Sequence, residues 1–342
     1  MIGLKQVADV AGVSASTVSR VLNGKSYVNE ETRKKVLTAV EKTNYKPNAI
    51  AKSLKEGRTN MICLMVPAIE NPIVPFIVRG VEDTARKLGF SVVLCNTGES
   101  RETEAHYIDI MTRRVADGFI FVSANGDEDK IYELHDNGVP VVIVNRFQPE
   151  DVNRLEIVTV DNYKAGYDAT NYLISCGRRR IAFAYGRNDL LLYRERYRGY
   201  TDALKDAGIG YDEALVMREE GSEECFYGKM SELMKSDNPP DAVFASSDPK
   251  AFIILHSLHD MNYKIPEDVA VIGFDDVQMA EMVEPPLTTV AQPLYDMGCK
   301  AAERLIARIG HKEEHGVLPP AVYNVLDYSI VVRKSAGKPI DD

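Results

Sequence analysis

Residues 12–24 read GVSASTVSRVLNG, a stretch that begins like a turn and continues like a helix. Its larger apolar side chains are few and are spaced as on one face of a helix: Val13, Val18, Val21 and Leu22. The other positions carry small or polar side chains: Ala15, Ser16, Thr17, Ser19 and Arg20. The stretch therefore predicts a short helix with a narrow buried stripe and a second face that is left for a partner.

Helices are also predicted on both sides of this stretch. Residues 4–11 place apolar side chains on one helical face, and Gly12 supplies the left-handed position at which that helix ends. Ser14 stands where the N-cap of the second helix belongs. A third helix is expected from after Asn29 to about Thr43. Its buried stripe is expected from Val36, Leu37 and Val40.

Two helices joined by a glycine-containing turn are typical of the helix-turn-helix unit, whose second helix enters the major groove of DNA. Small side chains at Ala15, Ser16 and Thr17 would let the helix backbone approach the groove floor, where the hydroxyls of Ser16 and Thr17 could bond bases or phosphates. Arg20 could donate two hydrogen bonds to a guanine. The alternative is an ordinary three-helix bundle with a polar face, because helix spacing alone does not distinguish the two.

The distribution of charge favours DNA binding. Residues 1–60 carry 11 Lys and Arg against 5 Asp and Glu, whereas the rest of the chain carries 30 against 46. Salt screens charges beyond about 8 to 10 Å, so the acidic remainder does not cancel a local attraction to nucleic acid. The alternative is a chance fluctuation in surface charge.

Length and cysteine content narrow the class of protein. At 342 residues the chain can form two or three domains, each with its own core. Its five cysteines are scattered singly without a CxxC pair, so neither a disulfide framework nor a zinc site is indicated. The first residues show no basic and apolar leader, and the longest apolar runs are about a third of a bilayer span. We therefore expect a cytoplasmic protein without a membrane, metal or cofactor partner.

The segment YKPNAIAKSLKEG, residues 45–57, predicts a helix that is too short to persist alone in water. Leu54 stands in it among polar and cationic neighbours: Lys52, Ser53 and Lys55. An apolar side chain flanked by cations is what minor-groove binders insert between base pairs. A single exposed leucine is usually without such a role, and that alternative stays open here.

The sequence over residues 4–54, LKQVADVAGVSASTVSRVLNGKSYVNEETRKKVLTAVEKTNYKPNAIAKSL, resembles the DNA-binding end of the lactose repressor and galactose repressor family. The resemblance implies base contacts in the major groove by three residues: Ala15, Ser16 and Arg20. It also implies a minor-groove wedge formed by Leu54, with Ala51 and Lys55 beside it. Family members often have larger side chains at the first two positions, so the preferred operator is left open.

From about Met61 the pattern changes to apolar runs that alternate with amphipathic stretches. The first series of runs is MICLMVP, SVVLC, GFIFVSA and VPVVIVN, and the second is RIAFAYG, DAVFASS and VAVIGF. Apolar strands that alternate with helices predict parallel sheets covered on both faces, and two series predict two subdomains. The family resemblance extends over this region and implies a periplasmic-binding-protein-like fold, in which the chain crosses between subdomains three times.

The expected organisation follows from these patterns and the resemblance. It comprises an all-α helix-turn-helix domain over residues 1–47, a hinge helix and linker over 48–60, and an effector-binding and dimerisation α/β core over 61–342. On the family analogy, the N subdomain takes about 61–160 and 291–320, and the C subdomain takes about 161–290 and 321–342.

Ligands of open parallel sheets bind beyond the carboxyl ends of the strands, so the residues after each apolar run are candidates. The resemblance implies that Arg196 and Asp275 bind an effector, commonly a sugar. A planar donor and a carboxylate acceptor suit adjacent sugar hydroxyls, although a surface ion pair is the default for either residue alone. Further candidates near strand ends are Asn71, Phe76, Asn145, Arg146, Ser247, Asp248 and Gln292.

The chain departs from the family pattern at several of these positions. The family often has Asp where Asn145 stands, Asn where Ser247 stands, and a stacking aromatic near Glu223. The chain contains no tryptophan, so the aromatic face is expected from Phe226 or Tyr193. A hexose is therefore only one candidate for the effector.

Catalytic motifs are absent or lack their usual context. The chain has no GxGxxG, no GxxxxGK followed by Ser or Thr, and no GxSxG. HKEEH at residues 311–315 fits the HxxEH metalloprotease pattern, but we expect a solvated loop there, after a helix that ends near Ile309. Asp275 and Asp276 are consecutive at a strand end, so one is expected to face the cleft and the other to cap or pair.

The sequence thus predicts a ligand-responsive transcriptional regulator without enzymatic activity, and specifically a repressor of carbohydrate or related small-metabolite genes. Its predicted partners are palindromic operator DNA, a sugar or sugar derivative, and a second copy of the chain. The absence of a long heptad tail favours a dimer over a tetramer. The alternative is a sugar-binding protein or sugar-processing enzyme that carries a DNA-binding arm.

Overall fold

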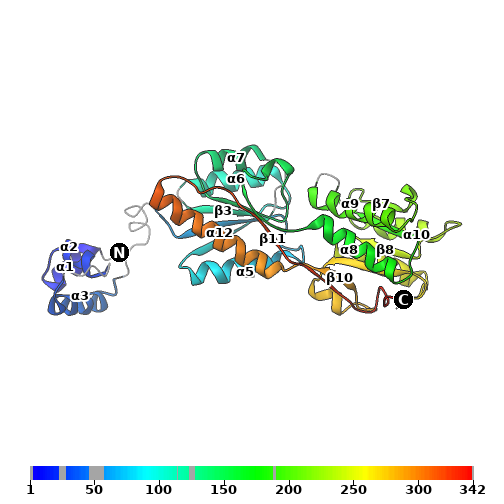
Figure 1. Cartoon of the computed structure of the whole chain (residues 1–342). Helices are drawn as coiled ribbons and strands as arrows, with labels where there is room; N and C mark the ends of the chain where they lie inside the picture. Colours follow the sequence, from blue (N-terminus) through cyan, green and yellow to red (C-terminus); the bar gives the residue numbers. More distant parts are fainter. Residues whose placement is uncertain are drawn as a thin grey trace. The chain divides into compact units, whose positions relative to one another are not determined.

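The computed structural model describes residues 3–22, 28–45, 58–113, 115–122, 128–187 and 190–340. The chain divides into two compact units, Met1–Thr59 and Asn60–Asp342 (Figure 1). The predicted hinge helix, with Ala51, Leu54 and Lys55, lies outside the described residues. Over the described ranges, no helix combines the length and the apolar character that crossing a lipid bilayer requires.

The first unit is built from three helices: α1 (Leu4–Ala11), α2 (Ala15–Leu22) and α3 (Glu30–Thr43). Gly12 ends α1 with a left-handed φ of 65°. Ser14 Oγ accepts a hydrogen bond from the backbone N–H of Thr17 at 3.2 Å, and the side chain of Asn29 caps α3 in the same way. The predicted helix boundaries and caps are therefore confirmed.

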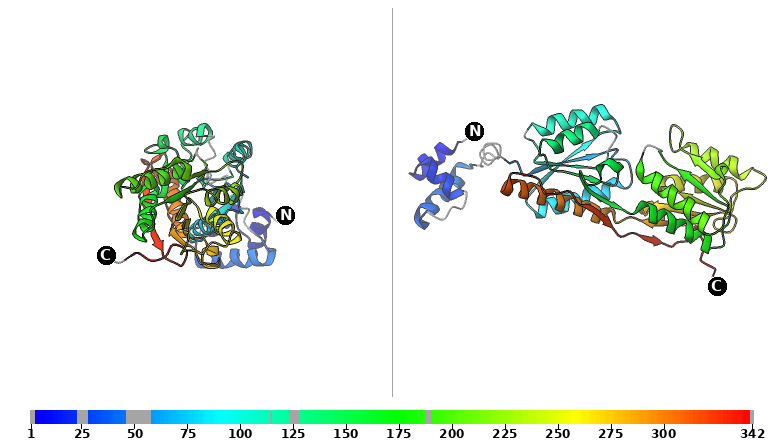
Figure 2. Two further views of the ribbon diagram at one scale, coloured as in Figure 1. Left: turned by 90° about the vertical axis from the view of Figure 1, so that its right-hand side faces the viewer. Right: turned by 45° about the horizontal axis from the view of Figure 1, so that its top comes forward.

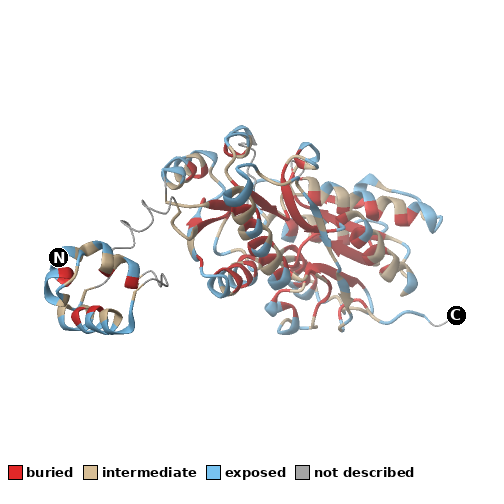
Figure 3. Cartoon of the chain, turned by 60° about the vertical axis from the view of Figure 1, so that its left-hand side comes forward, coloured by how far each residue is buried: buried red, intermediate tan, exposed pale blue. Residues whose placement is uncertain are grey.

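The core of this unit consists of small apolar side chains: Val7, Ala8, Val18, Val21, Val36 and Ala39. Figure 3 shows the ribbon of the chain with buried positions in red. Leu37 was expected in the buried stripe of α3, but it is 47% exposed. Successive residues of a helix are rotated by about 100°, so the face centred on Val36 includes position 39 and turns position 37 towards solvent. Ala39 therefore takes the buried place expected for Leu37.

The second unit contains two lobes, each a six-stranded sheet between layers of helices (Figure 2). The sheet of the first lobe has the order β11-β5-β4-β3-β1-β2, and all its neighbouring strands are parallel. Its strands are β1 (Met61–Val66), β2 (Ser91–Asn96), β3 (Gly118–Phe121), β4 (Val141–Val144), β5 (Glu156–Val160) and β11 (Tyr323–Leu326). Its helices are α5 (Val74–Lys87), α6 (Arg101–Thr112), α7 (Glu128–Asp136), α12 (Leu294–His315) and the 3-10 turn η1 (Pro149–Asp151).

The sheet of the second lobe has the order β12-β10-β9-β8-β6-β7. Its strands are parallel except for the antiparallel pair of β10 and β12. They are β6 (Ile181–Tyr185), β7 (Val216–Arg218), β8 (Ala242–Ala245), β9 (Ala270–Asp275), β10 (Thr288–Ala291) and β12 (Ser329–Val331). The helices are α8 (Asn162–Ser175), α9 (Leu191–Asp206), α10 (Cys225–Met234), α11 (Asp248–Asp260) and the 3-10 turns η2 (Glu213–Leu215) and η3 (Gln278–Glu281).

Strand residues alternate between two apolar layers, as β1 illustrates. Ile62 and Leu64 face the layer shared with α5 and α12, whereas Cys63 and Met65 face the layer shared with α6 and α7. All four side chains are fully buried. Burial on both faces explains why this strand reads as a continuous apolar run rather than an alternating one.

The chain passes between the lobes three times: from β5 to α8, from β10 to α12, and from β11 to β12 (Figure 1). The boundary expected near residue 320 lies too early, because β11 pairs with β5 of the first sheet. The last crossing falls between Leu326 and Ser329. Glu156 accounts for this placement, since its carboxylate accepts hydrogen bonds from Val322 N at 3.0 Å and Asn324 Nδ2 at 3.1 Å.

The loop predicted at residues 311–315 is helical instead. α12 continues to His315 and ends at Gly316, which has a left-handed φ of 76° and donates to Lys312 O at 2.8 Å. The rings of His311 and His315 stack with their centroids 4.2 Å apart. Within the described part of the chain, no group of three or more His, Cys, Asp or Glu residues is placed to hold a metal ion.

Candidate DNA-contacting helix and effector cleft

α2 turns one face to the core of the first unit and the other to solvent. Val18 and Val21 are buried, which sets the rotation of the helix about its axis. The predicted DNA-contacting residues are exposed (Ser16, Arg20) or half-buried (Ala15, Thr17). The hydroxyl of the capping Ser14 lies within hydrogen-bond distance of those of Ser16 and Thr17, at 2.8 and 2.9 Å. Ala15 also packs against the core of the unit, and the contacts of all four residues with DNA stay a prediction.

A cleft of about 860 Å³ lies between the two lobes of the second unit. It is bordered by residues at the carboxyl ends of strands from both sheets, where open parallel sheets bind their ligands. Seven of the predicted effector-binding residues line it: Asn71, Phe76, Asn145, Arg146, Arg196, Ser247 and Asp275. Its volume lies in the range of small-molecule sites.

The other two predicted residues lie behind the wall of the cleft. Asp248 is fully buried and accepts hydrogen bonds from Thr289 Oγ1 at 2.6 Å and from Val277 N at 2.9 Å. Burial raises the pKa of its carboxyl, and the charge of Asp275 raises it further. Gln292 donates from Nε2 to Asp275 Oδ1 at 2.7 Å. Gln292 therefore supports Asp275, whereas the carboxylate of Asp248 holds Thr289 and the backbone of Val277. Neither residue lines the cleft.

Arg196 of α9 is held from several sides. Its side chain is 1% exposed. Nε donates to Asn162 Oδ1 at 2.9 Å, and Nη1 donates to the carbonyl of Ser246 at 2.6 Å. The guanidinium carbon lies 3.4 Å from the centre of the Phe274 ring. Burial lowers the pKa of Arg196, while Asp275 opposes that shift. The guanidinium has five N–H groups, so it retains donors for a ligand.

The position of Arg196 depends on close packing between α8 and α9. A Cβ on Gly166 would lie 2.4 Å from the carbonyl oxygen of Arg196, and a Cβ on Gly199 would lie 2.2 Å from that of Tyr163. Carbon and oxygen atoms do not approach so closely without displacing the backbone. The two glycines therefore bring the helix that carries Arg196 against its neighbour.

Asp275 ends β9 in an unusual backbone conformation. Its φ is 130° and that of Asp276 is 58°, both in the region that favours glycine. Asp275 is 5% exposed and lines the cleft, whereas Asp276 forms an ion pair with Arg333 at 2.7 Å. The prediction that one carboxylate faces the cleft and the other pairs is confirmed. Burial raises the pKa of Asp275, and the nearby Arg196 opposes that shift.

The cleft wall also contains a buried lysine that was not predicted from the sequence. Lys250 is 1% exposed, and its Nζ lies 2.5 Å from Glu223 Oε1 and 3.4 Å from Glu219 Oε2. Nζ also lies 3.2 Å from Ser247 Oγ. Burial acts to lower the pKa of Lys250, but Tyr193 and the two carboxylates raise it above its ordinary value. Its spacing from Ser247 is one signal in the sequence, because Lys250 follows that N-cap residue of α11 by three positions and so lies on the same side of the helix.

Tyr193 lines the cleft together with Phe76 and Phe252, and its ring centre lies 4.9 Å from Lys250 Nζ. Of the two aromatic residues that the sequence predicted as alternatives, Tyr193 reaches the cleft and Phe226 does not. Phe226 is fully buried in the apolar layer that α10 and α11 form with the second sheet. It therefore contributes to packing and not to the cleft.

A charged contact joins the two lobes beside the cleft. Glu99 of the first lobe accepts a hydrogen bond from Arg146 Nη1 at 3.1 Å. The other oxygen of the same carboxylate accepts from Arg187 of the second lobe. Glu99 has a left-handed φ of 57° in the turn before α6. The lobes are thus linked by one carboxylate that serves two guanidinium groups.

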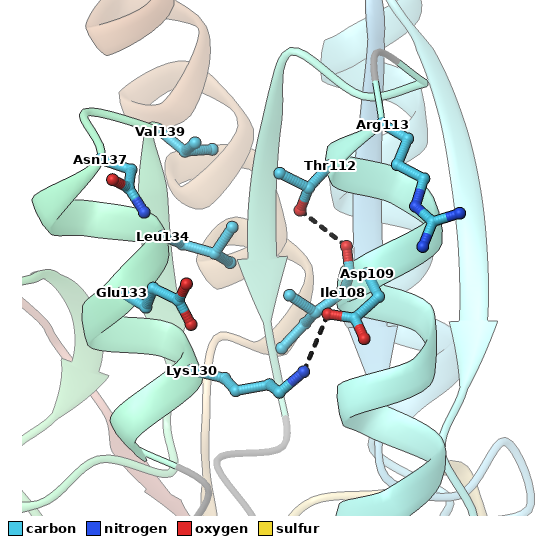
Figure 4. A pocket seen from close by; sticks show the side chains of 9 residues that line it. All are labelled: Ile108, Asp109, Thr112, Arg113, Lys130, Glu133, Leu134, Asn137 and Val139. Carbon is cyan, nitrogen blue, oxygen red and sulfur yellow. Dashed lines mark hydrogen bonds and ion pairs between the residues drawn. The ribbon is translucent and has the colours of Figure 1, made fainter.

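A second hollow, of about 400 Å³, lies between α6 and α7 on the first lobe (Figure 4). Its Lys130 and Asp109 form an ion pair at 2.8 Å, and Thr112 donates to the carbonyl of Ile108 at 2.6 Å. Asp109 is exposed, and Lys130 is half-buried. The hollow lacks the buried, convergent donors and acceptors of the interlobe cleft, which is therefore the stronger ligand site.

A helix-turn-helix unit joined to a two-lobed α/β domain whose interlobe cleft contains several charged side chains is typical of ligand-responsive DNA-binding proteins. Two family models match the chain: "Bacterial regulatory proteins, lacI family" over residues 3–48, and "Periplasmic binding proteins and sugar binding domain of LacI family" over residues 59–318. The chain belongs to the LacI family of DNA-binding transcriptional regulators.

Individual relatives resemble the chain along almost its whole length. The transcriptional regulator RegA of Clostridium acetobutylicum is 39% identical over 336 residues, which cover 97% of this chain and 98% of RegA. Catabolite control protein A of Priestia megaterium is 34% identical, covering 90% and 92% of the two chains. The solved complex of the transcriptional regulator CelR with cellobiose is 34% identical, with a TM-score of 0.74 and coverage of 98% and 100%.

Proposed function

We propose that this chain represses carbohydrate or related small-metabolite genes. It binds a palindromic operator as a homodimer, and a sugar or sugar derivative in the cleft changes its affinity for that DNA. Regulation of transcription by DNA binding follows from the family. The repression, the palindrome, the homodimer and the sugar are the parts that this proposal adds.

The observation that carries the effector proposal is a buried donor and a buried acceptor that line the same cleft. Arg196 retains N–H donors, and Asp275 offers carboxylate oxygens. Adjacent sugar hydroxyls both donate and accept, so they match this pair, and each hydrogen bond to a charged group contributes about 1.5 to 3 kcal/mol. Asn145 Oδ1 adds a buried acceptor to which no described protein group donates. The CelR relative, which was solved with cellobiose, supports a ligand of this class.

The DNA contacts are proposed for two sets of residues. In the major groove they are Ala15, Ser16, Thr17 and Arg20 on α2, and in the minor groove they are Ala51, Leu54 and Lys55. Exposure of Ser16 and Arg20 supports the first set, whereas the second set lies outside the described residues. If Leu54 is a wedge, Leu54→Ala should reduce DNA bending and leave effector affinity unchanged. Unchanged bending in a ligation or fluorescence-transfer assay would exclude the wedge.

Coupling between effector and DNA requires a ligand that prefers one arrangement of the lobes. A ligand shifts an equilibrium only by its difference in affinity for the two states. A change from 1:99 to 99:1 needs about 5.5 kcal/mol of preference. A hydrogen bond to a charged group contributes about 1.5 to 3 kcal/mol, so two strong or four weak bonds of this kind supply that difference if they form in only one arrangement of the lobes.

The test combines DNA selection with a ligand panel. The full-length protein selects duplexes from genomic fragments, and fluorescence anisotropy then measures its affinity at one fixed salt concentration with and without each sugar. We expect a palindromic site to bind about 10³-fold or more tightly than random DNA, as two protomers per site. One or more sugars should change that affinity.

The matched variants separate sensing from DNA binding. Arg196→Ala should abolish the sugar response and leave the affinity for DNA alone unchanged. Arg198→Ala is the control, because Arg198 lies on the same helix but pairs with Glu195 on the surface at 2.6 Å. Equal affinity for palindromic and random DNA would contradict the proposal. Sustained consumption of a sugar would favour an enzyme that carries a DNA-binding arm.

A further inference from the structure

The charged residues that line the cleft restrict the class of effector. Among the described residues the cations are Arg146, Arg187, Arg196 and Lys250. The carboxylates are Glu70, Glu99, Glu219, Glu223 and Asp275. Acidic groups therefore outnumber basic ones in the space that the effector would occupy.

Three of the four cations already serve a carboxylate of the protein. Arg146 and Arg187 both donate to Glu99. The three N–H groups of Lys250 have three acceptors within 3.4 Å, namely Glu223, Glu219 and Ser247. An anionic ligand would have to displace a protein acceptor from Lys250, and at Arg146 and Arg187 it would lie beside the Glu99 carboxylate that both guanidinium groups already serve. The fourth cation, Arg196, interacts electrostatically with Asp275, which would repel an anion.

Several acceptors that line the cleft retain lone pairs for a ligand. Glu219 and Glu223 are 14% and 37% exposed, so both carboxylates reach the cleft while Lys250 holds them. A carboxylate has about four lone-pair sites, and one lysine N–H occupies only one of them. Asn145 Oδ1 has no donor among the described groups of the protein. The matching ligand therefore carries several donors, whereas a phosphate or carboxylate supplies only acceptors.

We propose that Lys250 sets effector specificity as a positioning residue. It holds Glu219 and Glu223 as acceptors on the cleft wall, so that the site selects an uncharged, hydroxyl-rich ligand and rejects one with a carboxylate or phosphate. This inference rests on the proposed function of the cleft as an effector site. Without Lys250 the two carboxylates repel each other and leave the positions in which they accept from a ligand.

The test compares matched ligands by titration calorimetry with the full chain. The sets are glucose, glucose 6-phosphate, glucuronate and glucosamine; ribose and ribose 5-phosphate; cellobiose and cellobionate. We expect the uncharged member of a bound set to bind about tenfold or more tightly than its anionic partner, since like charges in a site cost several kcal/mol. Lys250→Met should weaken the uncharged ligand by about tenfold.

The informative variant is Glu219→Gln with Glu223→Gln, because it leaves the buried Lys250 without a carboxylate. Its anionic ligands should gain affinity, and the preference for the uncharged member should fall by about tenfold. If this variant does not fold, the triple variant that adds Lys250→Met removes every charge of the group. That variant should lose the discrimination without gaining affinity for anions. Lys229→Met is the control, since Lys229 pairs with Glu220 at 2.6 Å and does not line the cleft.

Each outcome decides a different point. Tighter binding of a charged member of either sign to the wild type overturns the inference and leaves the effector site standing. An unchanged preference in the Glu219→Gln, Glu223→Gln variant also overturns it. If no member of any set binds, the proposed sugar-sensing function is contradicted, and so is the inference that rests on it.

Discussion

Replacing Glu156 by Gln tests the buried network that fastens the C-terminal segment to the first lobe. Glu156 is fully buried, and Arg308, which is 1% exposed, donates to it at 2.9 Å. Arg304 donates to the other oxygen at 2.5 Å. The backbone N–H of Val322 and the side chain of Asn324 complete the set. Gln keeps the volume of Glu but removes the charge and turns an NH₂ group towards a guanidinium.

The expected loss follows from the burial of the partners. Removing one member of a buried ion pair leaves the other uncompensated and costs about 3 to 5 kcal/mol. Arg304 is 32% exposed, so its own lost contact adds only about 0 to 1 kcal/mol. We therefore expect the free energy of unfolding of the second unit to fall by about 3 to 5 kcal/mol. Typical stabilities are about 5 to 15 kcal/mol, so the variant should remain folded.

Urea unfolding followed by circular dichroism measures this loss, and hydrogen exchange locates it. Peptides that contain β11 and β5 should lose protection first, because Glu156 joins these strands to α12. Glu303→Gln is the matched control, since Glu303 pairs with Lys300 at 3.4 Å on the exposed side of α12, and it should change stability by about 0.5 kcal/mol or less. Adding Arg308→Met to Glu156→Gln should recover part of the loss because no buried charge is then left unpaired. A loss below about 1 kcal/mol with intact protection of β11 would refute the reasoning.

Three further perturbations test the DNA-contacting helix and the cleft. Arg20→Ala should cost about 1 to 3 kcal/mol of operator affinity and relax preference at one base pair per half-site, and equal losses on operator and random DNA would contradict a base contact. Gly166→Ala should destabilise the second unit by about 1 to 3 kcal/mol and weaken effector binding, because the added Cβ would lie 2.4 Å from Arg196 O. Gly210→Ala is the control, because a Cβ on Gly210 would have no heavy atom within 4 Å beyond its chain neighbours. Burial raises the pKa of Asp275 above its ordinary value of 3.8. As the pH rises from that value through the raised pKa, the buried carboxyl loses its proton, and the protein should lose stability. Over the same pH range its affinity for a hydroxyl-rich effector should increase, because the ionised carboxylate is the better acceptor. Both slopes should flatten in Asp275→Asn, and an unaltered slope measured by calorimetry and urea unfolding would remove Asp275 as their source.

The long, strongly patterned elements could be predicted from the sequence, and the short or polar ones could not. Residues 4–11 form α1 as expected, and every quoted apolar run contains a strand. β5 was missed because it begins with a charged residue, Glu156, whose burial depends on arginines from α12. β10, β11 and β12 have no long apolar run, and β11 and β12 pair with strands that are not their neighbours in the sequence. Their formation is decided by tertiary pairing, which local propensity does not contain.

The same distinction separates the predicted and the missed parts of the cleft. Residues at strand ends could be found because sheet topology brings the carboxyl ends of parallel strands together. Asn145, Ser247 and Asp275 are of this kind, and all three line the cleft. Lys250 comes from a helix, and Glu219 comes from the loop after β7, so no strand rule points to either. Their connection is a side-chain contact across the lobe, and only the folded chain brings them together.

Three polar residues that line the cleft have backbone conformations that favour glycine. Asn145 has a φ of 68°, Asp275 of 130° and Glu99 of 57°, and all three residues line the cleft. Left-handed conformations of residues other than glycine cost of order 1 to 3 kcal/mol each in unfavourable cases, and less for Asn. Such conformations persist only when surrounding contacts hold the residue in place. Asp275 is held in this way by its burial and by the hydrogen bond from Gln292. The fold therefore holds these polar groups in place before a ligand arrives, which reduces the ordering that binding must impose on them.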